Sequence, residues 1–210
     1  MSKEKQNILV AGANGTTGRI IIDLLQNSNK YRPVAMVRKQ AQKDHFAEKN
    51  VATVLADLEE DVSHAFNDID KVIFAAGSGG KKVVEVDQEG AKRLIDAAKN
   101  AGTEKFVMLS SMGADDPSQA SELEAYLKAK HNADEYLRES GLNFTIVRPG
   151  QLTNNEGTGK IQLDTKLGKN GKISRADVAQ TLVDALPSEI KQNQTFEILA
   201  GEQPIEEAVS

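Results

Sequence analysis

Short apolar runs alternate with longer amphipathic runs along most of this chain. The short runs are rich in β-branched residues, which is typical of buried strands. We expect strands over residues 7–12, 33–38, 51–57, 70–77, 104–111, 143–150 and 195–201. The longer runs place apolar residues three or four apart, which is typical of helices with one buried face. We expect helices over residues 16–28, 40–50, 62–66, 83–102, 121–141 and 174–186.

This alternation defines the expected architecture. Strands that are apolar along their whole length are buried on both faces, as in a parallel sheet with helices on each side. Right-handed crossovers between such strands produce a doubly wound sheet. We therefore expect an α/β fold, a doubly wound parallel sheet, in a single domain over residues 1–210.

Individual residues mark where two of the expected helices begin and end. Ser121 with Glu124 three residues later predicts a helix start, and Gly102 and Gly141 predict helix ends.

Residues 151–173 are polar and glycine-rich, with few large apolar side chains. We expect this strip to form a loop or small hairpin over the sheet edge.

The first strand runs into the sequence "GANGTTGR", with glycines at three-residue intervals. Gly12 permits a tight turn, Gly15 lets a pyrophosphate approach backbone N–H groups, and Gly18 lets the helix pack closely on the strand. The free N–H groups of a helix start bind anions. A turn without a ligand is the alternative, but the first strand–helix junction favours a dinucleotide site. Its remaining expected members are Asn14, Thr16 and Thr17.

The end of the second strand favours NADP(H) over NAD(H). An NAD site usually has Asp or Glu there, on the ribose hydroxyls. This chain has Arg38 and Lys39 instead. A carboxylate would repel a 2′-phosphate, whereas a guanidinium binds it with charge-assisted hydrogen bonds. A solvated basic pair is the alternative interpretation.

The next two strand ends complete the expected cofactor site, because ligands bind at the carboxyl ends of parallel strands. We expect Asp57 to accept a hydrogen bond from the adenine amino group, with Leu58 covering the ring. Ala75, Ala76 and Gly77 are small enough for a ribose to lie against the backbone.

Candidate chemistry follows the fifth strand. Tyr126 and Lys130 are four residues apart on a predicted helix and share one face. A nearby ammonium stabilises a phenolate, so the pair could transfer a proton to or from a substrate oxygen. Ser110 and Ser111 end the strand, and we assign Ser111 to the substrate carbonyl and Ser110 to the backbone or cofactor. Chance spacing and a simple turn are the alternatives.

Together these segments resemble the atypical short-chain dehydrogenase/reductase superfamily, in its NAD(P)-binding NmrA-like or sugar epimerase-like branch. The segments are "GANGTTGR", "DQEGAKRLIDAAKNAG", "FVMLSS", "YLKAKHNADEYLRESGLNFTIVRPG" and "SRADVA". The resemblance implies a Rossmann fold with strand order 3-2-1-4-5-6-7 and the Tyr-x-x-x-Lys pair at Tyr126 and Lys130. It also implies that Lys130 binds the nicotinamide ribose and that Pro149 and Gly150 line the nicotinamide side.

The chain departs from sugar epimerases, which have a substantial C-terminal substrate region. Here only residues 151–173 and a short tail are available, so we expect this strip to act as a lid over the nicotinamide end. The leading hypothesis is an NADP(H)-dependent oxidoreductase acting on a small carbonyl, quinone or flavin-like substrate. The alternatives are an NADP(H)-binding redox sensor without turnover and a nucleotide-sugar epimerase or dehydratase.

Composition narrows the remaining possibilities. The chain is 39% hydrophobic and 27% charged, has a formal charge of −5 and contains no cysteine. It has no apolar run near the roughly 20 residues of a membrane helix, and "MSKEKQN" lacks the apolar core of a signal peptide. We therefore expect a cytoplasmic protein with a small-molecule substrate and no nucleic acid, membrane or metal site. Monomer and homodimer remain open.

Overall fold

A nine-stranded sheet runs through the molecule in the computed structural model, which describes residues 5–119 and 122–210. The parallel strands of this sheet confirm the expected order 3-2-1-4-5-6-7. In that order they are β3 (Ala52–Leu55), β2 (Tyr31–Val37), β1 (Gln6–Ala11), β4 (Lys71–Phe74), β5 (Lys105–Leu109), β6 (Phe144–Pro149) and β10 (Gln194–Ala200).

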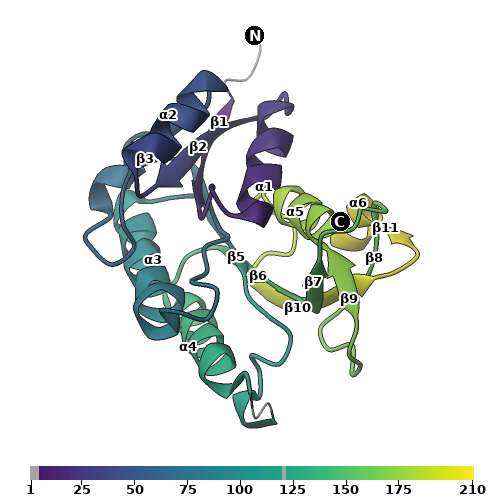
Figure 1. The fold of residues 1–210 in the computed structure, drawn as a ribbon. Helices are drawn as coiled ribbons and strands as arrows, with labels where there is room; N and C mark the ends of the chain where they lie inside the picture. Colours follow the sequence, from purple (N-terminus) through teal and green to yellow (C-terminus); the bar gives the residue numbers. More distant parts are fainter. Residues whose placement is uncertain (1–4, 120–121) are drawn as a thin grey trace.

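Helices cover both faces of the sheet (Figure 1). One face carries α1 (Thr16–Gln26), α2 (Gln40–Glu48), α5 (Arg175–Asp184) and α6 (Ile205–Val209). The other carries the 3₁₀ turn η1 (Ser63–Phe66), the π-helical turn η2 (Val83–Gln88), α3 (Glu89–Ala101) and α4 (Glu124–Glu139). A further 3₁₀ turn, η3 (Pro117–Gln119), precedes α4.

The two cores follow from side-chain alternation along the strands. Ile8 and Val10 of β1 pack with α1 and α5, whereas Leu9 and Ala11 face the α3 side. All four side chains are fully buried. Because successive residues of a strand point to opposite faces, continuous apolar strands require a helical layer on each side. The expected doubly wound fold is therefore present.

The strip over residues 151–173 differs from the expected loop or small hairpin over the sheet edge. It contains β7 (Gln151–Thr153), β8 (Lys160–Asp164) and β9 (Lys172–Ser174). β8 pairs antiparallel with β10 and with β11 (Gln203–Pro204), so the middle of the strip extends the main sheet. Ile161 is fully buried there. The alternation in "KIQLD" is too short to be distinguished from loop sequence without its partner strand.

A buried carboxylate holds the strip in place. Both oxygens of Asp177, on α5, accept hydrogen bonds: Oδ1 from the backbone N–H of Gly159 at 2.8 Å and Oδ2 from that of Thr158 at 3.1 Å. Asp177 is 3% exposed. These bonds satisfy backbone groups just before β8 and fix where that strand begins.

The helix ends agree with the expected signals where the structure describes them. Gly102 follows α3 with φ +71°, and Gly141 lies just beyond α4 with φ +82°, a left-handed conformation that glycine adopts without strain. α4 begins at Glu124. Ser121, the predicted N-cap, lies outside the described residues.

Lys105 gives the fold a predicted pH dependence. Its side chain is fully buried, and Nζ donates hydrogen bonds to the carbonyl oxygens of Pro187 and Ile190. Burial, and secondarily the nearby charge of Lys71, lower the pKa of Lys105 to about 8. In the unfolded chain a lysine holds its proton up to roughly pH 10.4. Between these values the unfolded chain binds more protons, so the free energy of unfolding rises with pH.

We therefore expect Lys105→Met to remove a positive slope of up to about 1.4 kcal/mol per pH unit between about pH 8 and 10. Urea unfolding across this range measures the slope. Lys99→Met, which removes an exposed lysine of α3, is the matched control. Equal slopes in the wild type and Lys105→Met would contradict the prediction.

Candidate cofactor and active site

The glycine turn between β1 and α1 is closely packed. Gly12 has φ +86°, and a Cβ there would come within 2.6 Å of the backbone of Ala75 and Ala76. A Cβ on Gly18 would lie 2.1 Å from the carbonyl oxygen of Gly12. The turn and the helix start therefore require glycine, because backbone occupies the space of a side chain. Gly15 is the N-cap of α1 and exposes the first N–H groups of the helix.

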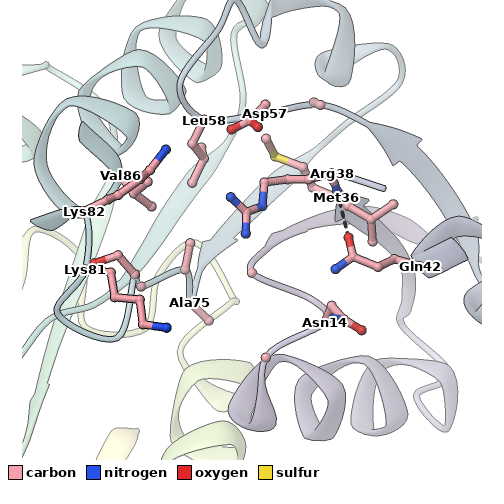
Figure 2. Close-up of a pocket in the computed structure, with 17 residues that line it drawn as sticks. Asn14, Met36, Arg38, Gln42, Asp57, Leu58, Ala75, Lys81, Lys82 and Val86 are labelled. Atoms are coloured by element: carbon pink, nitrogen blue, oxygen red, sulfur yellow. Dashed lines mark hydrogen bonds between the residues drawn. The ribbon is translucent and has the colours of Figure 1, made fainter. Parts of the chain in front are cut away.

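A cavity of about 460 Å³ opens beside this turn (Figure 2). It lies where β1, β2, β3 and β4 end, which is the expected side for a ligand of a doubly wound sheet. Its lining residues are Gly12, Asn14, Gly15, Met36, Val37, Arg38, Gln42, Ala56, Asp57, Leu58, Ala75, Ala76, Gly77, Ser78, Lys81, Lys82 and Val86.

Arg38 supplies a cation to this cavity. Figure 2 shows its guanidinium pointing into the cavity from the end of β2, toward the side on which Leu58 and Ala75 lie. Its backbone N–H donates to Oε1 of Gln42 at 3.0 Å, which fixes the chain at this corner. Within residues 5–119 and 122–210 the guanidinium has neither a hydrogen bond nor an ion pair, so it is available for an anion. Lys39 is exposed and does not line the cavity.

Sequence reasoning missed several lining residues. Lys81 and Lys82 come from the loop after β4 and face the same cavity as Arg38. Lys82 pairs with Glu59, with Nζ 2.7 Å from Oε2, and so joins the loops after β3 and β4. The glycine-rich stretch "GSGGKK" was the available signal, because small residues followed by cations suit a loop beside a phosphate.

Asp57 and Leu58, the residues predicted to contact adenine, both line the cavity wall. Oδ1 of Asp57 accepts a hydrogen bond from the backbone N–H of Glu59 at 3.1 Å, which leaves Oδ2 for a ligand. Leu58 is 6% exposed and presents an apolar surface. This wall therefore offers one acceptor and one apolar face, the two groups that an adenine ring needs.

Lys130 and Tyr126 lie together outside this cavity. Nζ of Lys130 is 5.7 Å from the centre of the Tyr126 ring and donates to the carbonyl oxygen of Leu109 at 3.4 Å. Lys130 is 4% exposed, whereas Tyr126 is half-buried. Leu109 is the last residue of β5, so the pair sits at the carboxyl edge of the sheet. The structure thus brings the predicted tyrosine and lysine together at the expected edge.

The two serines after β5 have different surroundings. Oγ of Ser110 donates to Oδ2 of Asp134 at 2.9 Å, and Asp134 also accepts two hydrogen bonds from Arg148. Asp134 is fully buried, and burial raises the pKa of its carboxyl despite the opposing effect of Arg148. Ser111 is half-buried, and its Oγ donates to the carbonyl oxygen of Met112 at 3.1 Å. Ser110 is therefore part of a buried network, and Ser111 is the more accessible serine.

This difference predicts separate effects for the two serines. Ser110→Ala should lower the free energy of unfolding by about 1–3 kcal/mol, because it removes a hydrogen bond to a buried carboxylate. Urea unfolding measures that loss. Ser111→Ala is the matched variant and should change stability by less than about 0.5 kcal/mol. A larger loss from Ser111→Ala than from Ser110→Ala would contradict this assignment.

The remaining predicted site residues lie on the same edge of the sheet but outside the cavity lining. Thr16 and Thr17 form the first turn of α1. Pro149 ends β6 and its carbonyl accepts from the N–H of Met112, while the N–H of Gly150 donates to the carbonyl of Ile198. Within residues 5–119 and 122–210, no helix meets the length and hydropathy of a membrane span, and no cluster of His, Asp and Glu forms a candidate metal site.

The chain belongs to a family of NAD(P)H-binding proteins, whose family model matches residues 12–189. The cavity fits such a cofactor, because the glycine turn admits backbone-bound phosphate and Arg38 provides a cation at the cavity wall. This membership confirms the NAD(P)-binding resemblance seen in the sequence motifs.

Individual relatives carry epimerase and reductase names. A Bacillus subtilis protein, the uncharacterised sugar epimerase YhfK, is 39% identical, covering 96% of this chain and 98% of its own. Sanguinarine reductase of Eschscholzia californica is 28% identical over 99% of this chain and 93% of its own. A solved Bacillus halodurans structure, provisionally described as an NAD-dependent epimerase/dehydratase, is 40% identical with TM-score 0.92 and covers 97% of this chain and 98% of its own.

Proposed function

We propose that this protein is an NADP(H)-dependent oxidoreductase that reduces a small carbonyl, quinone or flavin-like substrate. The observation that carries this proposal is the buried Lys130 ammonium beside the Tyr126 ring, at the edge where the cofactor-binding strands end. The similarity of this chain to a protein named sanguinarine reductase supports reductase chemistry. The Arg38 guanidinium in the cavity, which pairs with no carboxylate in the described part of the chain, supports NADP(H) over NAD(H).

The protein's own residues would handle the proton and the orientation of the substrate. A bound nicotinamide supplies the hydride. The Tyr126 hydroxyl donates a proton to the substrate oxygen, and the Lys130 ammonium stabilises the phenolate left behind. Ser111 donates a hydrogen bond to the carbonyl oxygen of the substrate. This bond replaces the one that its Oγ now donates to the carbonyl oxygen of Met112.

The position of β8 supports a small substrate. Because β8 pairs with β10, and Asp177 holds the residues before it, much of the strip 151–173 is already used in the fold. These residues are therefore less available to enclose a sugar nucleotide. A nucleotide-sugar epimerase is the second candidate, favoured by the names of the two most similar relatives reported above.

A substrate screen tests the proposal. NADPH oxidation is followed by absorbance against quinones, free flavins, aldehydes and ketones, with NADH in parallel. Oxidation of NADPH by at least one class, faster than oxidation of NADH, is expected. Tight NADPH binding without turnover of any class would indicate a redox sensor instead. Interconversion of a UDP-sugar without net loss of NADPH would indicate an epimerase.

A further inference from the structure

Asp87 is a buried carboxylate to which the proposed reaction gives no role. It lies in the π-helical turn η2 and is 1% exposed. Oδ2 accepts a hydrogen bond from the backbone N–H of Ser78 at 3.0 Å, whereas Oδ1 has no hydrogen-bond partner among the described residues. Burying a carboxylate is costly unless a nearby cation compensates it. Oδ1 therefore needs such a cation.

Lys130 is that cation. Its Nζ lies 3.5 Å from Oδ1 of Asp87, and both side chains are almost completely removed from water. Its other contacts are the long bond to Leu109 and the rings of Phe74 and Tyr126, at 5.8 and 5.7 Å from their centres. Within residues 5–119 and 122–210, no second carboxylate pairs with Lys130. Asp87 is thus the charge that fixes the direction of the ammonium.

The surrounding backbone fits this pair. A Cβ on Gly77 would lie 3.3 Å from Oδ1 of Asp87, so a side chain there would crowd the carboxylate. Ser78, held by the other oxygen, lines the cofactor cavity. π-Helical turns are rare and are frequent at functional sites, where they redirect side chains. One carboxylate therefore connects the cofactor loop after β4 with the lysine on α4.

The geometry points to Asp87 as the residue that positions Lys130 for the nicotinamide half of the cofactor. This inference rests on the proposed function, in which Lys130 acts with Tyr126, and on the contact between Lys130 and the nicotinamide ribose that the family resemblance implies. Asp87 touches neither substrate nor cofactor, and it acts through Lys130. Without its charge the ammonium loses the carboxylate that it pairs with among the described residues, and it can adopt other directions.

Asp87→Asn tests this role, because asparagine keeps the shape and can still accept from Ser78 while the charge is lost. The affinity for NADPH should fall about tenfold, which lies within the range of interaction energies between neighbouring residues. The affinity for adenosine 2′,5′-bisphosphate should not change, because this fragment lacks the nicotinamide half. Calorimetric titration measures both. Asp184→Asn, which alters a half-buried carboxylate at the end of α5 outside the cavity lining, is the control and should leave both affinities unchanged.

A purely structural role through Ser78 would give a different result. Asp87→Asn would then weaken the binding of NADPH and of the bisphosphate equally, because Ser78 lines the cofactor cavity. This outcome would overturn the inference. Adding Asp87→Asn to a Lys130→Met variant should have no further effect on NADPH affinity. A second tenfold fall in that background would also overturn it.

Thermal unfolding gives an independent test if Asp87→Asn folds poorly by itself. Lys130→Met leaves Asp87 buried without its cation, so adding Asp87→Asn should raise the melting temperature of the Lys130→Met variant. A lower melting temperature in the double variant would overturn the inference. A lack of turnover in the substrate screen would instead refute the proposed function and leave the binding results intact.

Discussion

Replacing Tyr126 by phenylalanine should reduce kcat for NADPH-dependent reduction by about 10²–10⁴-fold, the usual contribution of a positioned general acid. The hydroxyl is the atom that would donate the proton, while the ring that packs against Lys130 is kept. NADPH affinity should therefore stay within about twofold, since the change falls on the transition state alone. Steady-state rates on the best substrate of the screen, with NADPH titration alongside, measure both quantities.

Tyr136→Phe is the matched control for this prediction. Tyr136 lies on the same helix, and its hydroxyl donates to Oδ1 of Asp96 at 2.8 Å on the exposed face of α3 and α4. Losing that hydroxyl should leave kcat unchanged. Full turnover in Tyr126→Phe would refute the assigned role of Tyr126, even if the protein proved to be a reductase.

Arg38→Gln should weaken NADPH binding by about 10–100-fold and leave NADH binding unchanged. The expected size corresponds to the loss of charge-assisted hydrogen bonds to one phosphate group. The guanidinium points into the cavity and pairs with no anion among the described residues, so its charge is available for the 2′-phosphate. The ratio of the two dissociation constants, measured by fluorescence titration, reports the change in preference.

Arg32→Gln removes an exposed arginine from the same strand and should alter neither constant. Raising the salt concentration should weaken NADPH binding more in the wild type than in Arg38→Gln, because exposed charges are screened. Equal losses of NADPH and NADH affinity in Arg38→Gln would mean that Arg38 shapes the pocket and does not bind the 2′-phosphate.

Much of the fold could be predicted because its signals are local. The alternation of Ile8 to Ala11 and the spacing in α1 depend only on neighbouring residues, and they predicted the doubly wound parallel sheet. The order of its strands was predicted from the family resemblance. The glycines of the first turn were equally readable, since a tight turn into a helix restricts the residue type at each position. Arg38 was proposed from its position, because the end of the strand next to that turn is where a dinucleotide site usually holds the adenosine ribose.

Other features depended on partners distant in the sequence. The sequence of β8 does not differ from that of a loop until β10 lies beside it, because five alternating residues carry little information alone. Asp87 and Asp134 lie on amphipathic helical stretches, where an acidic residue is normally solvated. Only the packing of η2 and α4 against the sheet shows that one pairs with Lys130 and the other with Arg148.

The sequence alone therefore determined the order of the elements, the glycine turn and the residue types at the strand ends. These properties arise from backbone conformation and from periodic burial, which act between close neighbours in the chain. Only the tertiary structure decided which polar side chains are buried pairs, which serine is accessible and where the cavity ends. Those outcomes depend on how elements from distant parts of the chain meet across the sheet, since burial changes a charge from a solvated group into one that requires a partner.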